Sequence, residues 1–239
     1  MWLRIASVVA LVAAVGATAA LFVHRGSGHD LSGIHVTRAT VETPAGPAQL
    51  VRLAVRLDDH RYRPAVVATA GVFVSQLDAL AAMNGDFYRS DGTSSGRLVI
   101  DHKQLTTGAG GEPNLGLDSG RAAIGTNLQG YRDIVSGKPI LIAAGKPNAR
   151  LRRGGVTSFQ IFTRAPRAAV ALAHGELWLV TVGAPGLTLR EWQRQLLHLG
   201  ARWALNMDGG PSVSLALDGQ RLVDQAEPGV PVAITIGAG

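Results

Sequence analysis

Short apolar runs, most of them closed by a glycine, proline or aspartate, recur from about residue 34 to the C-terminus of this 239-residue chain. The runs at 81–83, 97–100, 122–124 and 139–143 are shorter than a stable helix, so they predict strands. The 30 glycines and 11 prolines supply the turn residues between them. These features favour a sheet-rich globule over a helical bundle.

Two segments carry clearer local patterns. Residues 167–172 and 177–182 are largely apolar and flank His174-Gly175, which predicts a β-hairpin. Thr188-Leu189-Arg190-Glu191 has the spacing of a capping box, in which the threonine hydroxyl and the glutamate side chain cap the first turn of a helix. The helix that follows, over residues 189–199, places its apolar side chains on one face.

A second capping box, Ser75-Gln76-Leu77-Asp78, predicts another short helix just before the strand at 81–83. Strands at 49–57 and 230–236 complete the pattern, and no repeat of fixed period recurs. Strands with a few helices predict an α+β (mixed α/β) fold. We expect a central mixed β-sheet with a few flanking helices, preceded by an N-terminal hydrophobic helix.

The N-terminal segment predicts export. Arg4 precedes an uncharged run over residues 5–23, which at about 1.5 Å per residue nearly crosses a bilayer. This segment is interpreted either as a cleaved signal peptide, with Ala17-Thr18-Ala19 as the small-residue cleavage site, or as an uncleaved membrane anchor. Both interpretations place the folded part outside the cytoplasm.

Three parts of the chain follow from this pattern. Residues 1–25 form the signal peptide or N-terminal membrane anchor, and the polar, glycine-rich residues 26–33 form a linker. Residues 34–239 form one domain, a length that supports a hydrophobic core of its own. The expected location is periplasmic, extracellular or membrane-anchored and facing outside.

Charge is scattered along the chain. The net charge is +6, and few aromatic residues lie between the lysines and arginines, so nucleic acid is not a predicted partner. A dispersed positive charge suits an anionic small substrate or an anionic envelope glycan, although it serves solubility equally well.

Cofactor chemistry has little support in the sequence. The absence of cysteine excludes disulfides, thiolate metal sites and a cysteine nucleophile. None of the seven histidines stands in a metal-ligand spacing, so no zinc site is predicted. We expect no required cofactor. A divalent cation, Ca²⁺ or Mg²⁺, at Asp86 or Asp208 is an open alternative, because clustered oxygen ligands leave little trace in a sequence.

Two Asn-x-Asp motifs each follow a short apolar strand: Asn84-Gly85-Asp86 and Asn206-Met207-Asp208. Residues i and i+2 of an extended segment share a face, so each motif can present its amide and its carboxylate to one pocket. The two strand ends are therefore expected to converge on a common site.

Gly209-Gly210-Pro211-Ser212 continues the second motif. Its glycines permit unusual backbone angles, and its N–H groups could surround a phosphate or an oxyanion. The alternative is a plain hairpin between residues 203–207 and 213–217.

Two further glycine-rich segments are interpreted as loops. Gly92-Thr93-Ser94-Ser95-Gly96 has the spelling of a serine-hydrolase elbow, but polar residues precede it and a strand follows, so it predicts a polar loop at the rim of a site. Gly108-Ala109-Gly110-Gly111 resembles a phosphate loop only in composition.

Four motifs in order give the chain a family resemblance. They are Asn84-Gly85-Asp86-Phe87-Tyr88, Ser136-Gly137-Lys138-Pro139, Ala165-Pro166-Arg167 and Asn206-Met207-Asp208-Gly209-Gly210-Pro211-Ser212. In order and spacing, from about residue 81 to the C-terminus, the chain resembles the phosphodiester glycosidase family.

The resemblance implies a hydrolase that cleaves the glycosidic C–O bond of a glycosyl-1-phosphodiester, with water as the acceptor. An oxocarbenium-like sugar needs a carboxylate, and the departing phosphate needs its charge held. We therefore predict Asp208, Asp86 and Arg167 as catalytic residues, with the arginine holding phosphate. The predicted substrate- and phosphate-binding residues are Asn84 and Asn206, which would orient sugar hydroxyls, together with Gly85, Gly209, Gly210, Ser212, Ser136 and Lys138.

The chain departs from the family pattern at Ala168, Gly183 and Pro211. Proline removes one backbone donor from the proposed phosphate cradle. A non-catalytic protein that binds an envelope polysaccharide through the same pocket is therefore the alternative function. A phosphodiesterase that cuts the phosphorus–oxygen bond is a third.

Overall fold

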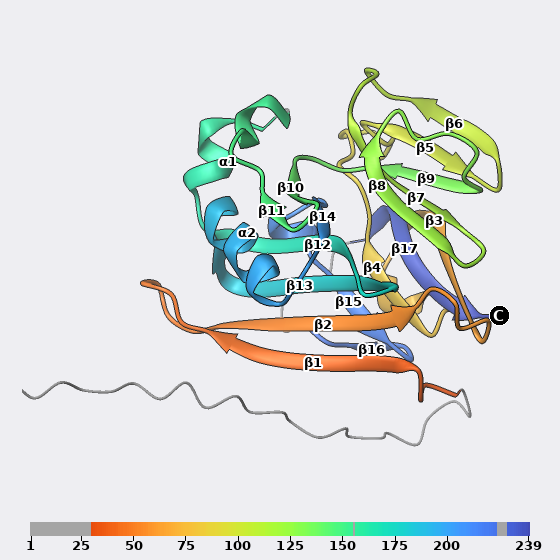
Figure 1. Cartoon of the computed structure of the whole chain (residues 1–239), viewed down its shortest axis with the longest axis horizontal. Coiled ribbons are helices and arrows are strands. Elements are labelled where there is room, and N and C mark those ends of the chain that lie inside the picture. The colour runs from red at the N-terminus through yellow and green to blue at the C-terminus, as the bar shows by residue number, and fades with distance from the viewer. Residues whose placement is uncertain (1–29, 155, 224–228) are drawn as a thin grey trace, which may run out of the picture.

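The computed structural model describes residues 30–154, 156–223 and 229–239 (Figure 1). The predicted N-terminal hydrophobic helix and signal or anchor segment, residues 1–25, lies outside the described residues, as do residues 26–29 of the linker. Within the described ranges, no helix has the length and apolar character needed to cross a membrane. The first strand begins at Ile34.

The described chain is mainly β, with three antiparallel sheets and two α-helices. The predicted α+β fold with a central mixed sheet is therefore wrong. Parallel strands need crossovers of a dozen or more residues, usually helical. Here several strands that are neighbours in sequence, such as β1 and β2 or β7 and β8, pair through short turns instead.

The spatial order of the strands differs from their order in the sequence in all three sheets. The first sheet contains β1 (Ile34–Val41), β2 (Ala48–Arg56), β13 (Glu176–Leu187), β12 (Ala165–Ala173), β14 (Trp203–Asn206), β10 (Ile140–Ala143) and β11 (Lys146–Pro147). The second contains β16 (Gln220–Arg221), β15 (Leu215–Leu217), β4 (Ala81–Asn84), β17 (Val230–Ala238) and β3 (Tyr62–Val72). The third contains β6 (Lys103–Thr107), β5 (Arg97–Ile100), β9 (Asp133–Ser136), β7 (Pro113–Asp118) and β8 (Arg121–Thr126).

The predicted central hairpin is confirmed. β12 and β13 pair from Leu172 opposite Leu177 outward, and His174 and Gly175 turn between them. Both turn residues have positive φ, 53° and 79°, the combination that a two-residue hairpin turn requires.

The stronger capping box is also confirmed. The second helix, α2 (Leu189–His198), begins after Thr188, whose hydroxyl accepts a hydrogen bond from the Glu191 N–H while the Glu191 carboxylate accepts one from the Thr188 N–H. The box predicted at residues 75–78 is wrong: only the three-residue 3₁₀ helix η1 (Val74–Gln76) forms there, without a side-chain cap. The first helix, α1 (Ser158–Phe162), follows a capping box that the sequence analysis did not predict.

Replacing Thr188 by alanine is expected to lower the free energy of unfolding by about 1 kcal/mol, because the first turn of α2 loses its hydroxyl acceptor. Denaturant unfolding measures the change. Thr188→Ser keeps the hydroxyl and should stay close to wild type. Equal stability of the alanine variant and wild type would show that the cap contributes nothing.

The first sheet is covered on both faces. Along β12, Ala168 and Val170 belong to the core shared with the other two sheets, whereas Ala169 and Ala171 belong to the core under the helices. Figure 1 shows α1 and α2 at one side of this sheet and the third sheet at the far end of the molecule. Burial on both faces explains why the apolar runs are continuous instead of alternating.

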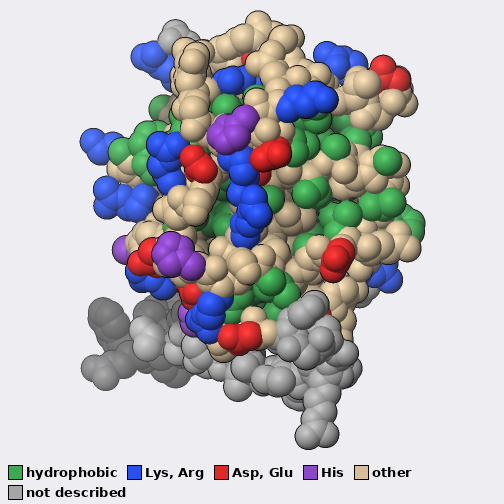
Figure 2. All heavy atoms as spheres, turned by 90° about the vertical axis from the view of Figure 1, so that its right-hand side faces the viewer, with side chains coloured by type: hydrophobic (Ala, Val, Ile, Leu, Met, Phe, Trp, Pro, Cys, Tyr) green, Lys and Arg blue, Asp and Glu red, His purple; other side chains and the backbone are tan. Residues whose placement is uncertain are grey.

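Surface charge is dispersed on the face that Figure 2 shows, where lysine and arginine side chains lie at separate places with acidic side chains and histidines between them. Exposed pairs such as Arg56 with Asp58, at 2.6 Å, neutralise some of the basic groups locally. Pairs of this kind contribute little to stability.

Candidate active site

The two Asn-x-Asp motifs meet where the first and second sheets adjoin. The Asn84 side chain donates to the main-chain oxygen of Asp208 at 2.8 Å and accepts from the Ser214 N–H at 3.1 Å. The Asp208 N–H donates to the oxygen of Gly85 at 3.2 Å. The ends of β4 and β14 are therefore held together through main-chain contacts.

The alternative of a plain hairpin over residues 203–217 is wrong. β14 belongs to the first sheet and β15 to the second, and the 3₁₀ helix η3 (Gly210–Ser212) lies between them in the chain. The glycine-bearing segment therefore crosses from one sheet to another at the site.

Asn206 braces the same region from the other side. Its Nδ2 donates to the Lys138 oxygen at 2.8 Å, and the Lys138 N–H donates to the Asn206 oxygen at 2.8 Å. Its Oδ1 is buried and has no hydrogen-bond partner among the described residues. Both asparagines thus hold the main chain in position. Their role in orienting sugar hydroxyls stays a prediction, and Asn206 Oδ1 is the atom left to accept such a hydroxyl.

Asp86 is almost fully buried, at 3% exposure. The Ser94 hydroxyl donates to its Oδ2, while its Oδ1 has no partner among the described residues. Burial raises the pKa of Asp86 to about 7; the Ser94 hydrogen bond opposes this rise and the charge of Asp208 adds to it. Asp86 is therefore a carboxyl group that exchanges a proton near neutral pH.

Asp208 has more donors around it. Burial raises the pKa of its carboxyl group, but the Ser212 hydroxyl, the Gly209 N–H and the charge of Lys138 each favour the ionised form. The Gly209 N–H donates to its Oδ1 at 3.0 Å. The two carboxyl groups thus lie within electrostatic reach of each other in different surroundings, an arrangement that separates acid–base roles in many enzymes.

Arg167, at the start of β12, is buried and makes no ion pair among the described residues. Its Nε donates to the Leu187 oxygen at 2.9 Å, and its Nη2 donates to the oxygens of Gln160 and Thr163 at 3.0 and 2.7 Å. Burial lowers the pKa of Arg167 to about 10. A guanidinium with no carboxylate partner is suited to hold an anion.

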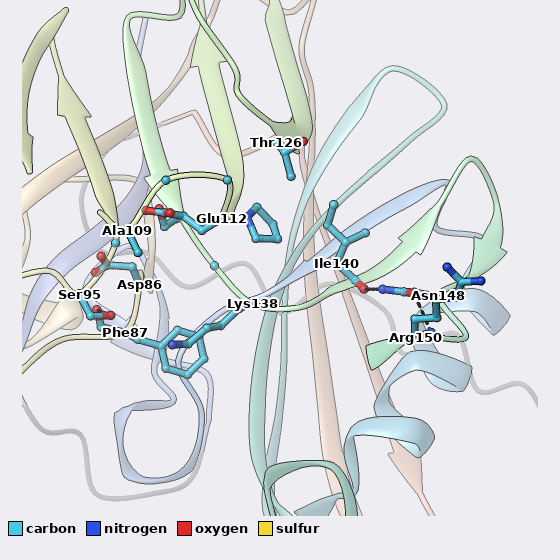
Figure 3. Close-up of a pocket in the computed structure, with 16 residues that line it drawn as sticks. Asp86, Phe87, Ser95, Ala109, Glu112, Thr126, Lys138, Ile140, Asn148 and Arg150 are labelled. Carbon is cyan, nitrogen blue, oxygen red and sulfur yellow. Dashed lines mark hydrogen bonds between the residues drawn. The ribbon is translucent and has the colours of Figure 1, made fainter. Parts of the chain in front are cut away.

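Two cavities adjoin these residues, and Phe87 lines both. The smaller, of about 160 Å³, is lined by Arg167, Asp208, Gly209 and Gly210, among others. The larger, of about 570 Å³, contains Asp86 in its wall (Figure 3). Asp208 and Arg167 therefore share the smaller cavity, whereas Asp86 lines the larger one, within electrostatic reach of Asp208. Their catalytic roles stay predictions.

The larger cavity also holds two predicted binding residues, Ser136 and Lys138. The Ser136 hydroxyl accepts a hydrogen bond from the Arg97 N–H at 2.7 Å and donates one to Asn114 Oδ1 at 2.8 Å. It therefore links neighbouring strands of the third sheet. The Lys138 ammonium lies 5.1 Å from the centre of the Phe87 ring and stays within reach of the cavity.

The phosphate cradle differs in detail from the prediction. The Gly209 N–H is directed to the carboxylate of Asp208, and the Ser212 hydroxyl bonds to the same carboxylate. Ser212 also lies 3.4 Å from the Tyr88 hydroxyl. Phosphate binding by Gly209, Gly210 and Ser212 therefore stays a prediction, with Arg167 lining the same cavity as the two glycines.

Sequence reasoning missed two residues of the site. Ser94, in the loop interpreted as a rim, bonds directly to Asp86. Glu112 lines the larger cavity and belongs to no motif that could have marked it. Among the described residues, no group of three or more His, Cys, Asp or Glu side chains could hold a metal ion, and the Ca²⁺ or Mg²⁺ alternative at Asp86 and Asp208 stays a prediction.

A sequence model of the phosphodiester glycosidase family matches residues 78–237. The chain belongs to the phosphodiester glycosidase family, which confirms the resemblance carried by its motifs. Among curated proteins, no sequence matches the chain.

Solved structures share the fold at low identity. A hypothetical protein from Synechocystis superimposes with a TM-score of 0.76 at 15% identity, over 87% of this chain and 62% of that one, so the chain spans less than two thirds of that protein. The catalytic domain of zebrafish N-acetylglucosamine-1-phosphodiester alpha-N-acetylglucosaminidase, auto-inhibited by its pro-peptide, superimposes with a TM-score of 0.69 at 16% identity. The match covers 86% of this chain and 83% of that one. A Burkholderia pseudomallei protein provisionally described as exported superimposes with a TM-score of 0.64 at 14% identity, and the match covers 80% of this chain and 74% of that one.

Proposed function

We propose that this chain hydrolyses the glycosidic C–O bond of glycosyl-1-phosphodiesters in exported or envelope glycans, with water as the acceptor. Its family membership supports this reaction class. The observation that carries the proposal is the buried carboxyl group of Asp86 within electrostatic reach of the partly buried one of Asp208, which shares a cavity with Arg167, an arginine without a carboxylate partner among the described residues. The site thus combines carboxyl groups that can stabilise a developing positive charge on the sugar with a guanidinium that can hold the negative phosphate.

In the proposed reaction, the bond between the anomeric carbon and the phosphate oxygen breaks, and the phosphomonoester leaves with the electron pair. The Asp208 carboxylate stabilises the oxocarbenium-like carbon. Asp86 accepts a proton from the water whose oxygen bonds to that carbon. The phosphate needs little protonation as it leaves, so Arg167 and Lys138 act by holding its charge.

The envelope setting rests on two supports. The uncharged run at residues 5–23 is interpreted as an export signal or anchor. One protein of the same fold, from Burkholderia pseudomallei, is provisionally described as exported. The proposed partner is therefore a glycosyl phosphodiester or an anionic envelope glycan.

The test is turnover by the purified full chain on a panel of sugar-1-phosphate diesters, scored by release of free sugar and phosphomonoester. Release from any diester supports the proposal. Binding without release would favour the non-catalytic polysaccharide-binding function, for which Pro211 and the Gly209 N–H, already bonded to Asp208, are the specific observations. Repeating the assay with a chelator tests the divalent-cation alternative.

The rate should depend on pH through Asp86. Because Asp86 acts as a base only when ionised and its pKa is raised to about 7, kcat/KM should rise about tenfold per pH unit below that value and level off above it. A pH–rate profile measures this. A rate that falls as the pH rises through 7 would assign Asp86 as an acid instead.

Ser94→Ala sharpens the test. The Ser94 hydrogen bond lowers the pKa of Asp86, so its loss should move the rising limb to higher pH. Ser90→Ala changes an exposed hydroxyl of the same loop and should leave the limb in place.

A further inference from the structure

Glu112 is held in a fixed position in the wall of the larger cavity. Its Oε1 accepts a hydrogen bond from the Arg97 N–H at 3.0 Å, and its main-chain oxygen accepts one from Asn114 Nδ2 at 2.8 Å. The chain keeps Gly108 at positive φ, +67°, directly against this carboxylate, where a Cβ atom would overlap Oε1. The loop at 108–111 therefore leaves room for the Glu112 side chain.

The second oxygen of this carboxylate, Oε2, is buried and has no hydrogen-bond partner among the described residues. Glu112 takes part in none of the ion pairs that these residues form. A buried acceptor without a partner is costly, typically about 1–3 kcal/mol and more for a charged group. A ligand that brings a hydrogen-bond donor to this wall removes that cost.

The charged residues around the larger cavity indicate whether this donor belongs to the sugar or to the phosphate side of the substrate. Asp86 and Glu112 lie toward one side of the larger cavity in Figure 3, with Lys138 nearer its middle and Arg150 at the other side. Two carboxyl groups repel a phosphate, which is attracted instead to Lys138 and to Arg167. Sugar hydroxyl and amide N–H groups are neutral donors that a carboxylate oxygen accepts well.

A cation shared by Asp86 and Glu112 fits less well. Ligand oxygens lie about 2.3–2.6 Å from Ca²⁺, so two carboxylates on one ion lie close together and act strongly on each other's ionisation. The carboxylate whose charge raises the pKa of Asp86 is that of Asp208. Among the described residues, no group of three or more His, Cys, Asp or Glu side chains could hold an ion here.

We propose that Glu112 binds the glycosyl unit by accepting a hydrogen bond from one of its hydroxyl or amide N–H groups, so that the larger cavity takes the sugar side of the substrate. This inference rests on the proposed function and adds a specificity-determining residue to it. Glu112→Gln is the matched change, since the glutamine Oε1 can still accept from the Arg97 N–H while the second position becomes a donor.

The test compares wild type and Glu112→Gln, both as full chains, on methyl N-acetyl-α-D-glucosaminyl phosphate and on analogues that each lack one hydroxyl or the amide N–H. With the parent compound, the variant should lose about 10- to 100-fold in kcat/KM. One analogue should cost wild type a similar factor, and with that analogue Glu112→Gln should cause little further loss. Glu42→Gln, at an exposed glutamate, is the control.

An equal loss on every analogue, or no loss on the parent, overturns the inference. If wild type hydrolyses none of the compounds, titration calorimetry measures Kd for each protein with each compound. The same pattern of losses is then expected in Kd. Binding that shows the pattern without hydrolysis defeats the proposed function alone. A wild-type chain that neither hydrolyses nor binds any of them overturns the inference, while release of sugar from another diester of the panel would leave the proposed function standing.

Discussion

Replacing Asp208 by asparagine is expected to lower kcat by about 10²- to 10⁴-fold while the protein stays folded. Asparagine has nearly the same shape, and its Oδ1 can still accept the Gly209 N–H that Asp208 Oδ1 accepts at 3.0 Å. The change removes the negative charge that stabilises the oxocarbenium-like carbon. Steady-state kinetics and thermal unfolding of the same preparation measure the two effects.

The matched control is Asp78→Asn, which makes the same chemical change at an exposed aspartate. It should leave both kcat and thermal stability unchanged. Wild-type turnover in Asp208→Asn would show that the carboxylate has no role in the chemistry.

Replacing Arg167 by alanine is expected to lower the free energy of unfolding by about 3 kcal/mol or more and to weaken substrate binding as well. The guanidinium donates to three main-chain oxygens, those of Leu187, Gln160 and Thr163. Its loss leaves these acceptors without their donor and removes a cation from the wall of the smaller cavity. Denaturant unfolding and KM measure the two effects separately.

Arg167→Lys tests the positive charge of Arg167 separately from the planar shape of its guanidinium. A lysine keeps the positive charge but not the planar fork, so it should recover part of the substrate binding and less of the stability. Arg190→Ala, at an exposed arginine of α2, is the control and should change neither. Unchanged stability of Arg167→Ala would show that its three main-chain contacts contribute nothing.

The features predicted correctly from the sequence are those with local signals. The β12–β13 hairpin depends on His174 and Gly175, and α2 depends on Thr188 and Glu191, which lie next to the elements they define. The convergence of Asp86 and Asp208 followed from two similar motifs at strand ends. Neighbouring residues alone were sufficient for the hairpin and for α2, whereas the convergence was expected from the likeness of two distant motifs.

The features missed depend on contacts between residues far apart in sequence. Whether β14 and β15 form a hairpin or join separate sheets is decided by their partners, β12 and β4, which no local pattern identifies. Ser75 failed to start a helix although its spacing matched that of Thr188. Glu112 reaches the site only because β7 belongs to the third sheet, so no motif could mark it.

The position of bond cleavage tests the central claim most directly. The full chain hydrolyses a sugar-1-phosphate diester in water labelled with ¹⁸O, and mass spectrometry locates the label. Cleavage of the C–O bond at the anomeric carbon places ¹⁸O in the sugar and leaves the phosphomonoester unlabelled. Label in the phosphomonoester would mean that the phosphorus–oxygen bond is cut, and would contradict the assignment of Asp86 and Asp208 to chemistry at the sugar.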